Sequence, residues 1–332
     1  MRSAWGMGVA AVLSLFAGGA AVAKPAVVVS VAPLHALVAG VMAGVGEPRL
    51  LVSGGASPHT YHLRPSDARA LNEADVVFWM GEGLETFLVK PIEALGKQAR
   101  SVELSEDAGL LMFPSREGGA WEPEAEGADH GGHVHGAGSH GAGSHGDASH
   151  AGHDHGAHDH GGDDMHAWLD PENARLIVRH AAGVLAEIDP ANGLAYTANA
   201  DRTVARIDAL DAEMRSTLAP VRAVPFVVFH DAYQYLERRY GLHAVGSVTI
   251  SPEQVPGARR LHEIREKIAA SGARCVFSEP QFSASLVSTV TEGTPARTAR
   301  LDPLGAAFEP GPVLYEKMMR DLAGSIRTCL AG

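Results

Sequence analysis

Between Pro190 and Leu218 the chain reads "PANGLAYTANADRTVARIDALDAEMRSTL". Ala, Leu, Arg, Asp and Glu dominate this stretch, and helix breakers are few beyond its first turn, so it predicts one long helix over residues 190–219. At about 1.5 Å per residue such a helix spans on the order of 40 Å. Since this length can bridge two lobes, we expect a rigid helix that links two globular halves.

On both sides of this helix, short β-branched runs alternate with helical patterns. The predicted strands before the helix are residues 26–33, 49–53, 75–81 and 101–104. The predicted strands after it are residues 225–230, 243–250, 274–279 and 298–301. Such alternation is typical of parallel sheets covered by helices. The expected fold class is therefore α/β, with one parallel-sheet lobe over residues 24–189 and a second over residues 220–332.

The first residues carry the pattern of an export signal. Arg2 precedes an apolar run that ends in Ala21-Val22-Ala23, which is a small-x-small cleavage site. A transmembrane anchor is the competing interpretation, but the run is short and is followed by no basic stop-transfer cluster. We expect residues 1–23 to be a signal peptide that is cleaved near Ala23, which leaves an exported, periplasmic protein that begins near Lys24.

The chain contains two cysteines, Cys275 and Cys329. In an exported protein two cysteines most simply form one disulfide, and two unpaired thiols are the alternative. A bridge between them would tie the C-terminal segment to the body of the second lobe.

The middle of the chain has an extreme composition. Ten histidines lie between Asp129 and Asp164, interleaved with Gly, Ala, Ser and Asp. Because almost nothing here can be buried, we expect a disordered His-rich loop over residues 117–164. Imidazoles interleaved with carboxylates attract Zn²⁺, Cu²⁺ or Ni²⁺, and an inert polar linker is the alternative. The tract alone does not indicate whether it would sense, buffer or deliver metal.

The net charge of −12 also comes mostly from this region. Ten acidic residues and no Lys or Arg lie between Glu117 and Asp164, and the remainder of the chain is close to balanced. The sequence therefore gives no indication of a nucleic-acid-binding surface.

Single histidines stand at the ends of predicted elements in both lobes. His59 follows the second strand in a Gly- and Pro-rich loop, His166 lies between the tract and a helix, and His230 ends the first strand of the second lobe. Ligands of open α/β sheets bind beyond the carboxyl ends of the strands. A lone histidine of this kind is more often structural, but three so placed beside a metal-attracting tract predict a metal site in the cleft between the lobes.

Five motifs carry a resemblance to a known family. They are "SPHTYHLRPSD", "MHAWLDP", "VFHDAYQYLERRYGL", "CVFSEPQF" and "LDPLG". In kind and order they resemble the solute-binding proteins of bacterial high-affinity zinc uptake ABC transporters, the ZnuA-like branch. The resemblance implies two α/β lobes joined by a long rigid helix, Zn²⁺ bound by His59, His166 and His230, and a disulfide between Cys275 and Cys329.

One position departs from the family pattern. Some zinc-binding members have Glu before the first ligand histidine, whereas this chain has Pro58, which offers no donor atom. Asp302 falls near the place of a metal-binding Asp in relatives. The fourth ligand could therefore be water, Asp302 or a tract histidine, and we weigh the first two above the third. Two further acids receive supporting roles: Glu279 is expected to orient a ligand imidazole, and Asp231 to cap the following helix.

The expected function is capture of Zn²⁺ in the periplasm and its delivery to an ABC permease in the inner membrane, by a protein that acts as a monomer and is not an enzyme. Three imidazoles and a water are also the plan of a zinc hydrolase, but no H-E-x-x-H motif is present. A free-standing periplasmic metal buffer is the third possibility.

Overall fold

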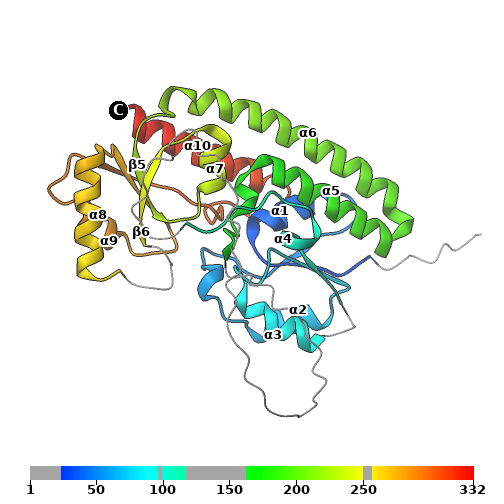
Figure 1. The fold of residues 1–332 in the computed structure, drawn as a ribbon. Helices are drawn as coiled ribbons and strands as arrows, with labels where there is room; N and C mark the ends of the chain where they lie inside the picture. Colours follow the sequence, from blue (N-terminus) through cyan, green and yellow to red (C-terminus); the bar gives the residue numbers. More distant parts are fainter. Residues whose placement is uncertain (1–23, 96–98, 117–161, 250–255) are drawn as a thin grey trace, which may run out of the picture.

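The structure is a computed structural model that describes residues 24–95, 99–116, 162–249 and 256–332. It contains two four-stranded parallel sheets, one in each half of the chain (Figure 1). The predicted α/β class with two parallel-sheet lobes is therefore confirmed.

The first lobe is built on the strand order β2-β1-β3-β4. Its strands are β1 (Val27–Val29), β2 (Arg49–Leu50), β3 (Val76–Trp79) and β4 (Arg100–Glu103). Its helices are α1 (Ala32–Val41), α2 (Pro65–Asn72), α3 (Thr86–Leu95), α4 (Leu104–Asp107) and α5 (Pro171–Ile188). The two central strands are buried along their whole length, because they consist of Val, Phe and Trp and carry helices on both faces.

The second lobe repeats this arrangement with the strand order β6-β5-β7-β8. Its strands are β5 (Phe226–His230), β6 (Ala244–Thr249), β7 (Cys275–Ser278) and β8 (Arg297–Arg300). Its helices are α7 (Gln234–Tyr240), α8 (Ala258–Ser271), α9 (Ala284–Thr291) and α10 (Leu314–Ala331). In both lobes the chain reverses its winding direction beside the first strand, which opens a crevice at the carboxyl ends of the strands.

The helix α6 (Gly193–Leu218) links the two lobes, as predicted, and the short 3-10 helices η4 (Pro190–Asn192) and η5 (Ala219–Val221) flank it. In Figure 1 it runs along both halves of the molecule, where it packs on α1, α5 and α10. The apolar part of its buried face has helical spacing and comprises Tyr196, Ala200, Val204, Ile207, Leu210, Met214 and Leu218. One continuous apolar core includes this face together with residues of both sheets.

Polar contacts fix α6 further. Arg206 forms an ion pair with Glu316 of α10 at 2.8 Å, and Glu213 pairs with Arg320 of the same helix at 2.8 Å. The Asn199 amide donates to the Val41 carbonyl at the end of α1, also at 2.8 Å. The lobes are therefore held by a packed helix and not by a flexible strand pair.

A disulfide joins Cys275, the first residue of β7, to Cys329 in the last turn of α10. Both cysteines are buried, with exposed fractions of 0% and 7%. The predicted bridge is confirmed, and it fastens the C-terminal helix to the centre of the second sheet.

Two predictions concern segments outside the described residues, namely the signal peptide over residues 1–23 and the His-rich loop up to residue 161. The loop was expected to extend to residue 164, but its last three residues belong to the described chain. Asp163 pairs with Pro114 in an antiparallel bridge and Asp164 is buried. Among the described residues, no helix combines the length and apolarity that a membrane span requires.

Candidate metal centre

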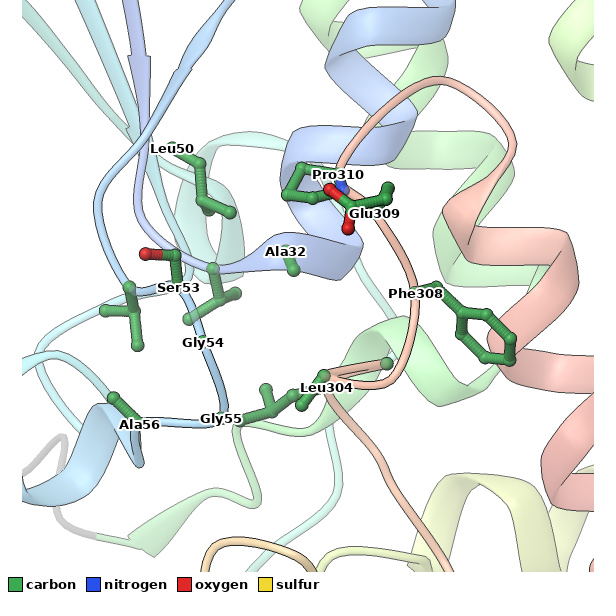
Figure 2. Close-up of a pocket in the computed structure, with 14 residues that line it drawn as sticks. Ala32, Leu50, Ser53, Gly54, Gly55, Ala56, Leu304, Phe308, Glu309 and Pro310 are labelled. Atoms are coloured by element: carbon green, nitrogen blue, oxygen red, sulfur yellow. The ribbon is translucent and has the colours of Figure 1, made fainter.

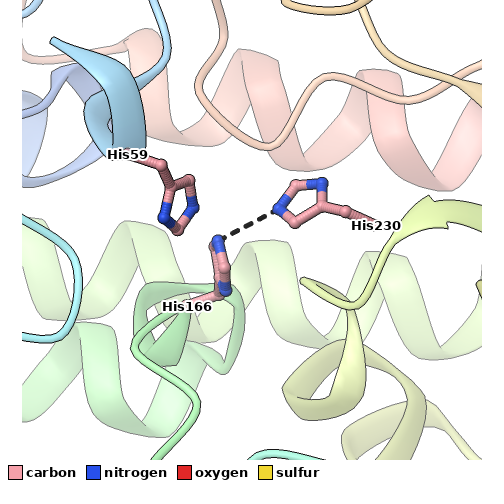
Figure 3. Close-up of side chains that lie close together, drawn as sticks. All are labelled: His59, His166 and His230. Carbon is pink, nitrogen blue, oxygen red and sulfur yellow. Dashed lines mark hydrogen bonds between the residues drawn. The ribbon is translucent and has the colours of Figure 1, made fainter. Parts of the chain in front are cut away.

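Three histidines from separate parts of the chain meet between the lobes (Figure 3). His59 belongs to the 3-10 helix η1 (Pro58–Thr60) that follows β2. His166 is the N-cap of the 3-10 helix η3 (Ala167–Leu169), which leads into α5. His230 is the last residue of β5. The first lobe thus supplies two imidazoles and the second lobe supplies one, at the crevice where strand topology places ligands.

The spacing of these imidazoles fits a bound ion. Each can direct one ring nitrogen into a set whose members all lie within 4.8 Å of one another. The Nε2 atoms of His166 and His230 are 3.3 Å apart. Tetrahedral zinc with Zn–N bonds of about 2.0–2.1 Å would place two ligand nitrogens roughly 3.3–3.4 Å apart. The pair therefore already has the separation that zinc requires.

Carboxylates behind two of the rings determine which nitrogen faces the site. The His166 Nδ1 atom lies 2.8 Å from Asp164 Oδ1, and the His230 Nδ1 atom lies 2.8 Å from Glu279 Oε1. Because an ionised carboxylate only accepts hydrogen bonds, each Nδ1 carries the proton and each Nε2 lone pair is free for a metal. The contact of Glu279 with His230 is the one expected from the sequence, whereas the composition of the His-rich tract does not predict the contact of Asp164 with His166.

The electrostatic environment keeps His59 neutral. Burial of its ring, together with the neighbouring His166 and His230, lowers the pKa of His59 to about 2. Its Nε2 atom is buried and has no hydrogen-bond partner among the described residues, although the residue as a whole is partly exposed. A buried, unprotonated and unpaired imidazole nitrogen is suited to accept a metal ion.

The situation of His230 is different. Burial acts to lower its pKa, but the charge of Glu279 and its hydrogen bond raise the pKa of His230 above the ordinary value. A proton therefore competes for this imidazole more strongly than for a free histidine.

The space beside the rings is small. The cavity offers about 10 Å³ of free volume, enough for one ion or one water molecule. Apolar groups cover much of it, namely Pro58, Phe282, Pro303 and Leu304. Three further lining residues carry buried polar atoms that have no hydrogen-bond partner within the described part of the chain: Ser57 Oγ, Glu279 Oε2 and Gln281 Oε1. Unpaired buried polar atoms are rare in folded proteins. Their concentration around this cavity indicates a site that binds an ion or a water molecule.

Asp302 lies in the loop after β8, and its neighbours Pro303 and Leu304 line the cavity. Its Oδ1 atom accepts hydrogen bonds from Gln281 Nε2 at 3.1 Å and from the Leu304 backbone N at 3.2 Å. Its Oδ2 atom is buried and has no hydrogen-bond partner in the residues that the structure describes. The donor group described above consists of histidines alone, so Asp302 as fourth ligand stays a prediction.

A groove adjoins the site and is shown in Figure 2. The loop of residues 53–56 forms one side and the loop of residues 304–310 forms the other, with about 200 Å³ of free space between them. Gly54 and Gly55 have φ angles of 69° and 79°, a conformation that side chains with a Cβ rarely adopt. The loop that carries His59 thus enters the site through a turn that requires glycine.

The chain matches the family described as "ZnuA: Zinc-uptake complex component A periplasmic" over residues 27–329. The protein named high-affinity zinc uptake system protein ZnuA from Brucella suis biovar 1 is 50% identical over 308 residues, which cover 93% of this chain and 92% of the relative. The protein of the same name from Paracoccus denitrificans is 43% identical over 309 residues, which cover 92% of each chain.

Solved structures support the fold. A crystal structure of ZnuA superimposes with a TM-score of 0.70 at 23% identity and covers 92% of this chain and 98% of that chain. The periplasmic zinc binding protein TroA from Treponema pallidum gives 0.71 at 20% identity and covers 93% and 99%. At this identity the likeness concerns the arrangement of lobes and helix.

The family match also decides between the classes of function considered above. It extends across both lobes, the linking helix and all three histidines, and the family consists of zinc-uptake components, not enzymes. The resemblance inferred from the five motifs is therefore confirmed, and the zinc hydrolase is rejected in favour of a solute-binding protein. On the evidence of its sequence and its fold, the chain belongs to the ZnuA family of periplasmic zinc-uptake components.

Proposed function

We propose that this protein binds one Zn²⁺ ion tightly between its lobes in the periplasm and delivers the ion to an ABC permease in the inner membrane. The observation that carries the proposal is the convergence of His59, His166 and His230 from two lobes on a space for one ion. Relatives named for high-affinity zinc uptake support the same assignment.

The donor chemistry favours zinc over harder cations. Neutral imidazoles suit Zn²⁺, whereas Mn²⁺ and Mg²⁺ prefer sets rich in oxygen. Water or Asp302 would complete the tetrahedron, since Pro58 offers no donor. Cu²⁺ and Ni²⁺ also bind imidazole, so selectivity against these two ions is expected to be incomplete.

Export and assembly follow from the same proposal. A signal peptide over residues 1–23 would be cleaved near Ala23, and the mature monomer would meet the permease at the membrane surface. We propose the domain boundaries 24–189, 190–219 and 220–332, since η4, α6 and η5 fall at the two junctions. Ligands from two lobes make the relative position of the lobes depend on the ion, so a permease can distinguish the loaded state.

The experiment that tests the proposal is zinc-dependent growth. A strain that lacks this gene should fail to grow when zinc is chelated, and the mature protein should restore growth only when the permease is present. Restoration without any permease would instead indicate a free-standing metal buffer, the alternative that remains. Uptake of radioactive zinc by the same strains gives the direct measurement.

A first prediction concerns the His-rich tract, which we propose to be a collector that raises the zinc concentration beside the ordered site. Deletion of residues 129–161 should leave one tight site with nearly unchanged affinity and remove the additional weak sites. The tract sites are expected to be weak because each zinc ion that binds there must also order a flexible segment of the chain, which costs conformational entropy. Titration calorimetry of the two proteins counts the sites. Growth should suffer mainly when zinc is scarce.

The deletion stops before Gly162 for a structural reason. Asp164 orients His166, so a deletion that extends to residue 164 would damage the site itself. Loss of the tight site in the shorter deletion would contradict the prediction and would identify a tract histidine as the fourth ligand.

A second prediction concerns pH. Because Glu279 raises the pKa of His230, zinc must displace a proton there, and the affinity of the tight site should fall by about tenfold per pH unit below that raised pKa. His59 should not contribute, since its pKa of about 2 keeps it neutral. Competition titrations between about pH 5.5 and 8 on the protein without residues 129–161 measure the effect.

The matched variant is Glu279→Gln. It removes the charge that favours the protonated ring, so the pH at which affinity begins to fall should move downward. If zinc affinity begins to fall at the same pH in Glu279→Gln as in the parent, the assignment of the titration to His230 is refuted.

A further inference from the structure

Two segments that flank residues 117–161 lie side by side and form a short stem, here defined as residues 110–116 and 162–166. The Ser115 N–H donates to the Gly162 carbonyl at 2.5 Å, and the Asp164 N–H donates to the Phe113 carbonyl at 2.8 Å. Pro114 and Asp163 form the antiparallel bridge between these two hydrogen bonds. The stem ends in the metal-site residue His166, so its position determines where that imidazole stands.

The stem belongs to the first lobe in sequence but rests on α7 of the second lobe. The Tyr235 hydroxyl donates to the Asp164 carbonyl at 2.6 Å and accepts from the Phe113 N–H at 3.1 Å. The Gln234 amide donates to the Pro114 carbonyl at 3.0 Å. The guanidinium of Arg238 lies 4.3 Å from the centre of the Phe113 ring, which is a cation–π contact.

Arg116 completes this contact with two bidentate ion pairs, here called the fork, in which one guanidinium binds two carboxylates. It donates to both carboxylate oxygens of Asp231, with the Nε–Oδ2 distance at 2.9 Å, and to both oxygens of Glu237 at 2.8 and 2.9 Å. The side chains of Asp231 and Glu237 are only 10% and 8% exposed. Asp231 directly follows His230, so the fork joins the end of the stem to the residue beside the ligand of the second lobe. The helix cap predicted for Asp231 is wrong, because α7 begins at Gln234 and the carboxylate binds Arg116 instead.

The charges make the fork necessary. Asp164 lies close enough to Asp231 and Glu237 for its charge to act on both of them. Without a cation these three largely buried carboxylates would repel one another across the contact between the stem and α7. Arg116 brings one positive charge between two of these carboxylates, and its planar fork holds both acceptors in one geometry, which a lysine ammonium cannot do.

We propose that Arg116 is a positioning residue that latches the stem bearing His166 to the lobe bearing His230, and thereby sets the distance between the two imidazoles before zinc binds. The latch does not touch the ion and acts through Asp231 and the stem. This inference rests on the proposed function, since it assigns Arg116 a part in the binding of zinc by this same site.

The test compares Arg116→Lys with Arg239→Lys in the mature full-length protein loaded with one equivalent of Zn²⁺. Arg239 is a matched control, because it belongs to α7 itself and is 20% exposed against 22% for Arg116. It forks onto Asp211 of α6, and its other carboxylate partner, Asp170 at 3.6 Å, lies outside the stem. Release of zinc into excess chelator is followed by stopped flow. Arg116→Lys should release zinc at least about tenfold faster, the size expected when partners behind metal ligands are lost, and Arg239→Lys should stay within about twofold of the parent.

Hydrogen exchange of the metal-free proteins separates the latch from general destabilisation. Arg116→Lys should increase exchange at Ser115 and Asp164 before it does so in the cores of the sheets, and zinc should restore much of the protection. Should Arg116→Lys not fold, Tyr235→Phe removes the hydroxyl contacts to both halves of the stem and should accelerate release in the same direction.

The outcomes are distinct. Wild-type release from Arg116→Lys, in a protein that binds zinc tightly, overturns the latch and leaves the proposed function standing. Release that accelerates only in variants without a positive charge, such as Arg116→Gln, also overturns it, because charge and not fork geometry would then be responsible. Absence of tight zinc binding in the parent would refute the proposed function itself.

Discussion

Replacement of His59, His166 or His230 by alanine is expected to weaken tight zinc binding by more than about 100-fold in each case. Loss of a group behind a metal ligand already costs about 10–100-fold in affinity, and loss of the ligand itself should cost more. The measurement is a competition titration against a chelator of known affinity, in the protein without residues 129–161, so that tract histidines cannot mask the loss.

His62 supplies the control for this series. It belongs to the same loop as His59 but is exposed and stands outside the group of three histidines. His62→Ala should therefore bind zinc like the parent. If the three ligand variants also bound zinc like the parent, the tight site would have to lie elsewhere in the chain.

Removal of the disulfide should have the second largest effect, on stability instead of binding. The bridge closes a loop with a sequence separation of 54 residues. Chain-entropy arguments assign to a loop of that length about 4 kcal/mol of stabilisation. Cys275→Ala combined with Cys329→Ala should lower the free energy of unfolding by about this amount, measured by urea denaturation of the metal-free protein.

Zinc affinity of the same double variant should change little, because the bridge lies at the start of β7 and the end of α10, away from the carboxyl ends of the strands. Mass mapping of unreduced exported protein should recover the peptide pair that contains Cys275 and Cys329. Free thiols in that material, or equal stability of the double variant, would count against the prediction.

The fold could be predicted closely from the sequence because its signals are local. Buried strands such as β1 and β3 are continuous apolar runs, and the helix over residues 190–219 has no competing pattern. The Asp170 carboxylate caps α5 through the Glu172 N–H, as its position before Pro171 indicates. Strands β4 and β8 begin one residue earlier than predicted, because these mostly exposed edge strands are bounded by pairing with their neighbours instead of by apolarity.

The site could be predicted only in part. The three histidines could be predicted as metal ligands, because they stand near the ends of predicted strands and helices, where α/β proteins have their ligand-binding crevice. The structure brings the three side chains together. The role of Asp164 could not be predicted, because the residues that precede it have the same composition as the rest of the tract. Only its position two residues before His166 distinguishes it from the other tract aspartates. The partner of Asp231 could not be foreseen, since Arg116 lies 115 residues away in the sequence and contacts at such separation leave no local pattern.

The stem has a consequence for the modularity of the chain. Because Ser115 and Gly162 are hydrogen-bonded to each other, the two ends of the segment between them stand as close as the ends of a hairpin turn. The free energy of closing a loop grows only with the logarithm of its length, by about 0.6 kcal/mol for each doubling. Segments of very different length and composition can therefore replace residues 117–161, between Arg116 and Gly162, without a large cost to the rest of the fold. The position is therefore an insertion site, at which a peptide tag, a fluorescent reporter or a binding sequence for another metal could be introduced within reach of the cleft.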